Sequence, residues 1–344
     1  MRHFRKSGLG LFATILLAGC AGDGESGGNP PLAPVFGSSE AGLVDGPAPT
    51  ARFSNPVNVA VAPNGTVYVA DFDNDAVRAI DTAGNVSTVI RQDGFSRPFG
   101  MTVANDGTLY VQTDANDSGD RDITTGTVWK HTPGGGAATV VARNLGRPRA
   151  LLALDDGRIL MANLSDNTIA ILNPRTSAVT LVAGQAGEGA FADGTGTGAR
   201  FNRPYGLAKM PDGSFVVADQ NNHRIRRFTL SGVVTTYAGT GGAGSVNGSL
   251  STATFNLPQD VEVTANGTVY VADQGNHVIR RIGSNVTTFV GDGTAGFAEG
   301  IGTAARFYGL EGIGLSPNGR RLWIADGNGG DGNDYNRVRF QDVN

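Results

Sequence analysis

Side chains that could bind a ligand recur along the chain, one in each of six related segments. Each directly follows a proline, or a leucine in the last segment, at the start of a run of β-type residues. The six residues are Val57, Phe99, Arg149, Tyr205, Gln259 and Glu311. In two segments the next residue is also polar, and these are Asn58 and Asp260. A guanidinium, a carboxylate, an amide and aromatic rings around one funnel can orient a small polar ligand. The alternative is a water-filled pore plugged by an Arg149–Glu311 pair.

Two acidic stretches carry oxygen ligands on a flexible backbone. One runs from Asp114 to Asp122, and the other contains Asp326, Asp331, Asn333 and Asp334 among several glycines. Carboxylate and amide oxygens in such loops suit Ca²⁺ or another divalent ion. Neither stretch has the ligand spacing or the terminal glutamate of an EF-hand. The alternative is a solvated polar loop that binds nothing.

Other catalytic chemistries find little support in the residues. The histidines beyond the N-terminal segment are His131, His223 and His277, and none of them begins an innermost β run. A zinc site needs several such ligands together, so a histidine-based zinc site is not expected. No Gly-x-Ser-x-Gly sequence, which would present a nucleophilic serine, occurs within residues 33–344 either.

A repeated hairpin must position these residues. Asn-Gly or Asp-Gly pairs lie between two β-type runs, with glycines at 65, 107, 157, 213, 267 and 319. Such pairs favour tight hairpin turns because both residues tolerate positive φ. Successive glycines are 42, 50, 56, 54 and 52 residues apart. This spacing is typical of one four-stranded propeller blade per repeat.

The sequence around each turn resembles the NHL repeat. The phrase runs from proline through the turn to Val-Tyr-Val-Ala-Asp at 67–71 and 269–273 and to Phe-Val-Val-Ala-Asp at 215–219, after which Asn-His-Arg-Ile-Arg-Arg follows at 222–227. The match covers roughly residues 33 to 343. Thr113, Asn163 and Leu310 depart from the pattern at single positions. The resemblance implies an all-β, six-bladed β-propeller.

The sixth repeat ends after three strands, and the N-terminal region contains a candidate fourth. Residues 33–53 align without a gap with residues 287–307, which pairs Gly37 with Gly291 and Phe53 with Phe307. Val35 and Phe36 should therefore form the outermost strand of blade 6 and close the ring. Closure removes an exposed blade edge. Deletion of residues 33–37 is expected to destabilise the whole ring.

Four glycine-rich connectors share the face on which the funnel opens. They span 37–53, 184–201, 239–255 and 291–307, and each contains an acidic residue or Asn before Gly, with Phe seven residues later. One interpretation is a compact loop tied to the ring by its phenylalanine. The other is that these loops recognise a partner.

The N-terminus has the features of an export signal. A basic stretch with Arg2, Arg5 and Lys6 precedes an apolar run, and Leu-Ala-Gly-Cys ends at Cys20, the single cysteine of the chain. The motif resembles the bacterial lipobox, which implies a signal peptide over 1–19 and a lipid on Cys20. Residues 20–32 then form a tether and residues 33–344 the propeller. Ala21 favours the outer membrane, and acylation gives a stable anchor in the bacterial cell envelope. The alternative is an ordinary secretory signal.

Charge and composition narrow the choice of partner. Without the three basic residues of the signal, 24 Lys and Arg face 31 Asp and Glu, a net charge of about −7. This balance argues against a nucleic-acid surface. The leading hypothesis is an envelope-anchored, monomeric scaffold that presents its loop-rich face to a protein, peptide or glycan. The rival is a metal-dependent hydrolase or lyase similar to the gluconolactonase-type propellers, with Glu311, Asn58 and Asp260 around the ion. A third possibility is that the pore has no function and that only the rim loops bind a partner.

Overall fold

The computed structural model describes residues 35–115, 120, 122, 124–187, 189–328 and 335–343. The expected signal peptide, the tether with Cys20, and three of the calcium candidates, Asp331, Asn333 and Asp334, lie outside these residues. The described residues belong to one compact unit. In the described part, no helix is long and apolar enough to cross a membrane.

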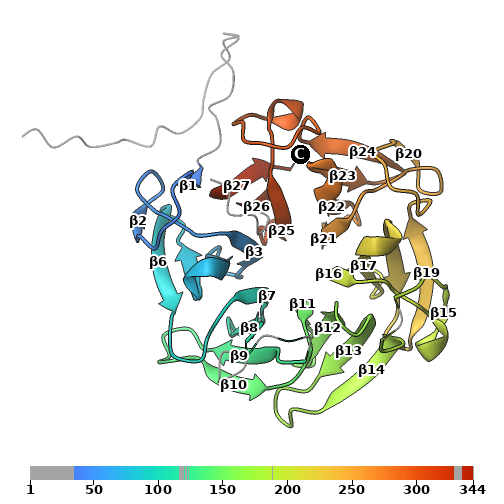
Figure 1. Ribbon diagram of the computed structural model, residues 1–344, viewed down its shortest axis with the longest axis horizontal. Coiled ribbons are helices and arrows are strands. Elements are labelled where there is room, and N and C mark those ends of the chain that lie inside the picture. Colours follow the sequence, from blue (N-terminus) through green and yellow to red (C-terminus); the bar gives the residue numbers. More distant parts are fainter. Residues whose placement is uncertain are drawn as a thin grey trace, which may run out of the picture. The chain divides into compact units, whose positions relative to one another are not determined.

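Six antiparallel sheets surround a central pore, which confirms the six-bladed β-propeller (Figure 1). The strands next to the pore are β3 (Pro56–Val61), β7 (Pro98–Val103), β11 (Pro148–Ala153), β16 (Pro204–Lys209), β21 (Pro258–Val263) and β25 (Gly309–Leu315). The second strands are β4 (Val67–Asp71), β8 (Leu109–Thr113), β12 (Ile159–Asn163), β17 (Phe215–Asp219), β22 (Val269–Asp273) and β26 (Arg321–Gly327).

The outer strands complete each blade. The third strands are β5 (Ala76–Ile80), β9 (Thr127–His131), β13 (Thr168–Leu172), β18 (Arg224–Phe228), β23 (Val278–Ile282) and β27 (Asn336–Asp342). The fourth strands are β6 (Asn85–Ile90), β10 (Thr139–Ala142), β14 (Val179–Gly184), β19 (Val233–Ala238), β24 (Asn285–Val290) and, from the N-terminal region, β1 (Phe36–Ser38).

The predicted ring closure is present. Strand β1 pairs antiparallel with β27, so that Phe36 lies opposite Val338 and Ser38 opposite Asn336. Phe36 is buried, with its ring 5.6 Å from that of Trp323. Segments from both ends of the described chain therefore share blade 6.

Three connectors add a short fifth strand that the sequence did not predict. These strands are β2 (Gly46–Pro47), β15 (Gly194–Thr195) and β20 (Gly248–Ser249), and they pair with β6, β19 and β24. Each connector thus leaves one blade and covers part of the outer edge of the next. Covering an edge in this way hides backbone groups that would otherwise invite further strands.

The core lies between adjacent blades. The second strands carry most of it, because all five residues of β4, β17 and β22 are buried. Their side chains alternate between the two neighbouring blades, as successive residues of a strand must. Burial on both faces explains why Val-Tyr-Val-Ala-Asp recurs as a continuous apolar run rather than an alternating one.

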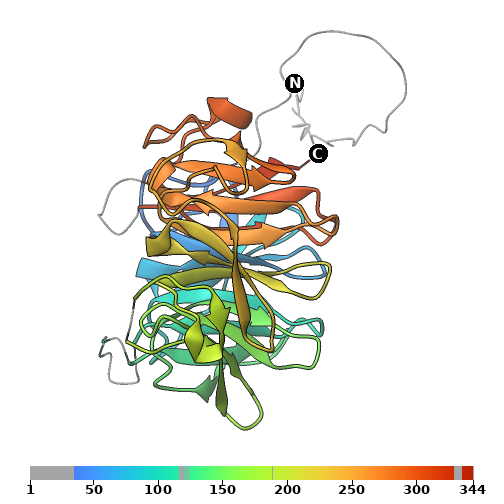
Figure 2. The same ribbon diagram turned by 90° about the vertical axis from the view of Figure 1, so that its right-hand side faces the viewer.

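The two faces of the ring differ in their connections. Tight turns between first and second strands, and between third and fourth, project to the right in Figure 2. The second-to-third connectors leave from the opposite face, and three of them contain the 3-10 turns η1 (Phe72–Asn74), η3 (Gln220–Asn222) and η4 (Gln274–Asn276). That opposite face also carries the long connectors, and we call it the loop face.

Candidate functional site

Six β-bulges place the predicted funnel residues at one mouth of the pore. In blade 5, Pro258 pairs with Asp273 and Asp260 with Ala272, so Gln259 is an extra residue without a partner on β22. The register shifts at the equivalent place in the other innermost strands too. A bulge turns a side chain away from its regular direction. Since these strands begin at the loop face, we call the ring of bulge residues the pore mouth.

Glycines beside the bulges let adjacent blades approach closely. A Cβ on Gly206 would lie 2.0 Å from Asp260 Oδ1, and one on Gly312 would lie 2.7 Å from the Cα of Asn58. Asn58 and Asp260 therefore pack against the inner strands of neighbouring blades. The space beside Gly206 and Gly312 is therefore filled by Asp260 and Asn58 rather than left for a ligand.

Arg149 pairs with Asp114, not with Glu311 as the plugged-pore interpretation supposed. Its two terminal nitrogens lie 2.6 and 3.0 Å from the Asp114 carboxylate oxygens. The guanidinium carbon also lies 4.1 Å from the centre of the Phe99 ring, a cation–π contact. Burial raises the pKa of Asp114, but Arg149 and a hydrogen bond from Gln112 outweigh it and hold the pKa below its usual value. Asp114 is thus a mouth residue that the sequence assigned to a calcium loop.

Tyr205, Gln259 and Glu311 each have a polar group at the mouth without a hydrogen-bond partner among the described residues. Within the described residues, neither the Tyr205 hydroxyl nor the Glu311 carboxylate makes a recorded hydrogen bond, and Gln259 Oε1 is buried without a partner. The Tyr205 ring lies edge-on to Phe99 at 5.6 Å. Burial raises the pKa of Glu311 to about 7 despite the attraction of Arg149. The predicted residues are therefore brought together, and ligand binding by them stays a prediction.

Deeper in the pore, two carboxylates link blade 5 to blade 6. Asp260 accepts hydrogen bonds from the backbone amides of Val261 and Ile313, at 2.9 and 2.8 Å. The backbone amides of Leu315 and Val263 lie near Glu262 and partly oppose the rise of its pKa. The hydrogen bond from Ile313 satisfies an amide on the open edge of β25. Glu262 was not predicted as a pore residue, because nothing in the sequence around it distinguishes it from an outward-facing residue.

This pair lines a cavity of about 210 Å³ in the pore, together with Asn58, Thr102 and several aliphatic residues. Burial raises the pKa of Asp260 to about 7 and that of Glu262, which also feels Asp260, to about 8. Asp260 already accepts hydrogen bonds from two backbone amides, so its carboxylate has a structural role. No group of three or more His, Cys, Asp or Glu side chains arranged to hold a metal occurs among the described residues.

The raised pKa values of Asp260 and Glu262 predict that the stability of the protein depends on pH. The folded protein holds these protons more tightly than the unfolded chain, in which a glutamate titrates near 4.5. The stabilisation that comes from the protonated Glu262 carboxyl is complete below pH 4.5 and is lost as pH rises through about 8. We expect Glu262→Gln to raise the free energy of unfolding by about 1–3 kcal/mol at pH 9 and little at pH 5.

Denaturant unfolding at both pH values measures the effect. Glu299→Gln is the matched control, because it makes the same change at an exposed residue. Equal pH dependence in the Glu262 variant and the wild type would show that this carboxylate does not titrate abnormally.

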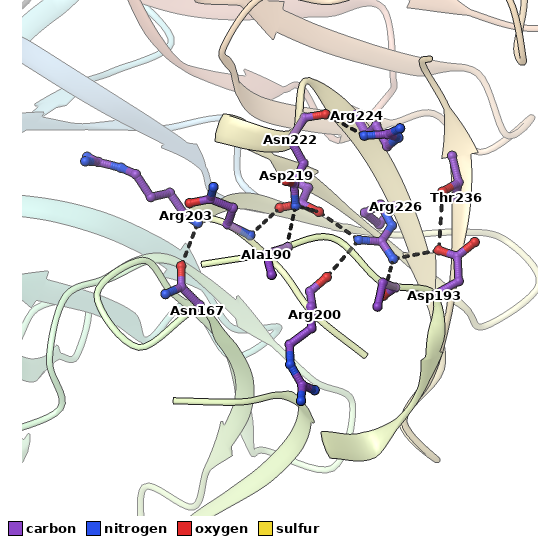
Figure 3. Close-up of polar contacts among 12 residues, drawn as sticks. Asn167, Ala190, Asp193, Arg200, Arg203, Asp219, Asn222, Arg224, Arg226 and Thr236 are labelled. Carbon is purple, nitrogen blue, oxygen red and sulfur yellow. Dashed lines mark hydrogen bonds and ion pairs between the residues drawn. The ribbon is translucent and has the colours of Figure 1, made fainter. Parts of the chain in front are cut away.

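A buried arginine ties each of four blades to its long connector, and Figure 3 shows the one in blade 4. In blade 4, Arg226 is fully buried and pairs with Asp219 at 2.8 Å and with Asp193 at 2.6 Å. It also donates to the backbone oxygens of Ala192 and Arg200. Asp219 accepts from the amide of residue 202 and from the Asn222 side chain. We call this set the arginine hub.

Equivalent hubs centre on Arg78, Arg280 and Arg339. The connector phenylalanines are buried against them at positions 53, 201, 255 and 307. This confirms the interpretation of the connectors as loops tied to the ring. A sequence signal existed, since Asp and Arg are seven residues apart in blades 1, 4 and 5, but no charge pair was predicted from it.

Asp326, a predicted calcium ligand, and His223, a histidine of the repeat, both have structural roles on the loop face. Asp326 is buried, pairs with Arg339 at 3.1 Å and accepts the amide of Tyr308, so its carboxylate belongs to the hub of blade 6. His223 adopts a left-handed conformation, with φ 51°, and its Nδ1 accepts the amide of Leu257 in the next blade. The histidine of the repeat thus links adjacent blades.

The opposite face has a hollow that the sequence did not indicate. It lies between blades 6 and 1, has a volume of about 850 Å³, and is lined in part by Phe36, Trp323, Phe340 and Arg321. Arg321 lies over the Phe340 ring at 3.8 Å and pairs with Asp342. This hollow borders the ring closure.

Comparisons with known proteins agree with the repeat and the fold. The model of the NHL repeat matches residues 201–228. The Arabidopsis thaliana protein SUPPRESSOR OF QUENCHING 1, chloroplastic, is 26% identical over 286 residues, which are 73% of this chain and 27% of that protein. The chain thus spans about a quarter of this relative's length.

Two solved structures share the fold at low identity. An auxiliary nutrient binding protein from Bacteroides thetaiotaomicron superposes with a TM-score of 0.69 at 18% identity, over 90% of this chain and 75% of that one. A gluconolactonase from Xanthomonas campestris superposes with a TM-score of 0.57 at 14% identity, over 91% of this chain and 99% of that one. At these identities the likeness concerns the fold alone.

Proposed function

Because the chain is an NHL-repeat β-propeller with six blades, we propose that it is a binding module that holds its ligand at the pore mouth. The ligand is a small polar group, either free or part of a protein, peptide or glycan partner. The long connectors act mainly as structural covers of the blade edges, since their phenylalanines and acidic residues are used in the arginine hubs.

One observation carries this proposal. The hub repeats nearly the same residues in four blades, whereas the bulge residues differ in every blade. Bulges commonly re-aim side chains near functional sites. At this mouth they bring together polar groups of Tyr205, Gln259 and Glu311 that have no hydrogen-bond partner among the described residues, beside the Arg149–Phe99 cation–π contact. A mouth that served only as scaffold would not require six different side chains.

Array binding with a double variant tests the site. The purified protein is applied to glycan and peptide arrays, and retention is compared with that of Tyr205→Phe/Glu311→Gln, which keeps the side-chain volumes. We expect at least a tenfold loss of retention on the recognised ligands, because hydrogen bonds to charged groups contribute about 1.5–3 kcal/mol. Glu299→Gln on the rim should bind like the wild type. Recognition that survives the double variant would move the site away from the mouth.

A metal-dependent hydrolase or lyase is the second candidate. The raised pKa of Glu311, next to Tyr205, is the observation that favours it, because groups poised near neutrality serve in acid–base chemistry. Metal analysis of the purified protein separates the two candidates. Stoichiometric metal that is lost on Glu311→Gln supports the enzyme, and its absence in both proteins supports the binding module.

We also propose attachment to the bacterial cell envelope through a lipid on Cys20. The Leu-Ala-Gly-Cys motif and the basic and apolar segments before it support this assignment. Two or more acyl chains would anchor the protein stably, whereas a single chain binds membranes only marginally. Cys20→Ser should release the protein from the membrane fraction.

A further inference from the structure

Two hydrogen-bond acceptors at the pore mouth have no partner among the described residues. Gln259 is nine-tenths buried, at 9% exposure, and its Oε1 has no partner in the described part of the chain. The Glu311 carboxylate likewise makes no recorded hydrogen bond there. Arg149, the single cation among the bulge residues, is already neutralised by Asp114. No bulge residue therefore keeps an uncompensated positive charge, although Arg147 and Arg203, each one residue before a bulge strand, lie within electrostatic reach of Asp114 and Tyr205.

The acceptors occupy adjoining positions around the ring. Strand β21 lies between β16 and β25, so Gln259 stands between Tyr205 and Glu311 (Figure 1). The Tyr205 ring completes one side, and its edge contact with Phe99 fixes its orientation. A carboxylate, a buried amide oxygen and an aromatic face are the features that recognise an organic cation.

We propose that the pore mouth binds the ammonium group of a primary amine, as in a lysine side chain. The carboxylate of Glu311 and Oε1 of Gln259 accept its protons, and the Tyr205 ring lies beside its alkyl stem. This inference rests on the proposed function and specifies the ligand class. An unpartnered buried acceptor is costly, and a bound ammonium removes that cost.

The electrostatics of the mouth add a pH dependence. Burial and the nearby Asp73 raise the pKa of Glu311, and Arg149 opposes them, with the balance at about 7. Among the described residues, Tyr205 and Asp114 also act on this cluster, and the charges of Arg203 and Arg147 act on Tyr205 and Asp114. The amine binds the ionised carboxylate, so affinity should be about tenfold higher at pH 8 than at pH 6.

Calorimetry with three small probes tests the inference. Nα-acetyl-lysine amide carries the ammonium, Nα-acetyl-norleucine amide is its uncharged counterpart, and calcium chloride supplies an inorganic cation. We expect the lysine probe alone to bind, with the stated pH dependence. Glu311→Gln should weaken it at least tenfold, and the exposed Glu299→Gln should not. Equal binding of the norleucine probe, or binding of calcium alone, would overturn the inference.

Gln259→Met provides a second and independent variant. It removes the orphaned oxygen with little change of volume, so the melting temperature should stay the same or rise while lysine binding falls. Unchanged lysine affinity in this variant would remove Gln259 from the site and contradict the proposal. If no probe binds but the array ligands still depend on Tyr205 and Glu311, the ligand class is wrong while the proposed binding site stands.

Discussion

Arg226→Met should lower the free energy of unfolding by about 3–5 kcal/mol, because it removes one partner from a buried ion pair. Asp219 and Arg226 are both fully buried, and the arginine contacts two carboxylates and two backbone oxygens. Methionine occupies similar space but leaves the Asp219 charge uncompensated. It also frees the connector over 184–201 from the blade.

Thermal and denaturant unfolding measure this loss, which corresponds to roughly 5–15 °C in melting temperature. Arg227→Met is the matched control. It lies next in the same strand and pairs with Asp212 at the surface, where exposed pairs contribute about 0–1 kcal/mol.

Blade 3 suggests how the loss can be reversed in part. At the hub positions it carries Asn163 and Ala170 in place of aspartate and arginine. Asn163 still accepts the amide of residue 147 and donates to the Leu145 oxygen. Asp219→Asn added to Arg226→Met should therefore recover part of the stability, since no buried charge remains. A double variant less stable than Arg226→Met would show that the hub does not act through the charge of Asp219.

The hub and the pore mouth differ in how far the sequence predicts them. Blade number and strand order follow from hairpin spacing, because a repeated turn and a repeated apolar run leave little freedom. The angular positions of Arg149 and Glu311 follow as well. The partner of Arg149 does not, because Asp114 comes from a connector whose path depends on tertiary packing.

Contacts between blades were the least predictable feature. Asp260 has the residue type of a metal ligand and the position of a pore residue, yet its oxygens bond two amides. The amide of Ile313 is 53 residues away in sequence, and the contact depends on the close approach permitted by Gly206. Neither the spacing nor the composition of a single repeat contains that information.

The ring closure, in contrast, was predicted from the alignment of 33–53 with 287–307, and the backbone explains why that alignment works. Gly37 lies within β1 and Gly291 directly follows β24, and both have positive φ, 87° and 104°. A Cβ on Gly37 would lie 2.2 Å from the backbone oxygen of Asn336. Glycine is required at that point for the chain to turn from β1 into the connector.

Phe36→Ala should lower the free energy of unfolding by about 3–5 kcal/mol, as expected for a buried aromatic truncated to alanine. Phe36 is 3% exposed and packs on Trp323, in a cluster that joins blade 6 to all four main strands of blade 1. Its loss leaves a cavity where the ring closes, so the damage extends to both blades. Val44→Ala, at an exposed position of the following connector, is the control and should change stability by less than about 0.5 kcal/mol.

Hydrogen exchange distinguishes closure from simple packing. Strand β1 pairs with β27 through Phe36, Gly37 and Ser38, so the amides of β27 should exchange slowly in the wild type. In Phe36→Ala they should exchange faster than those of β18 in blade 4, which is closed by consecutive strands of the chain. If β27 and β18 respond equally, the ring unfolds as one unit and β1 is no special point of weakness. If neither responds and the melting temperature is unchanged, β1 does not close the ring.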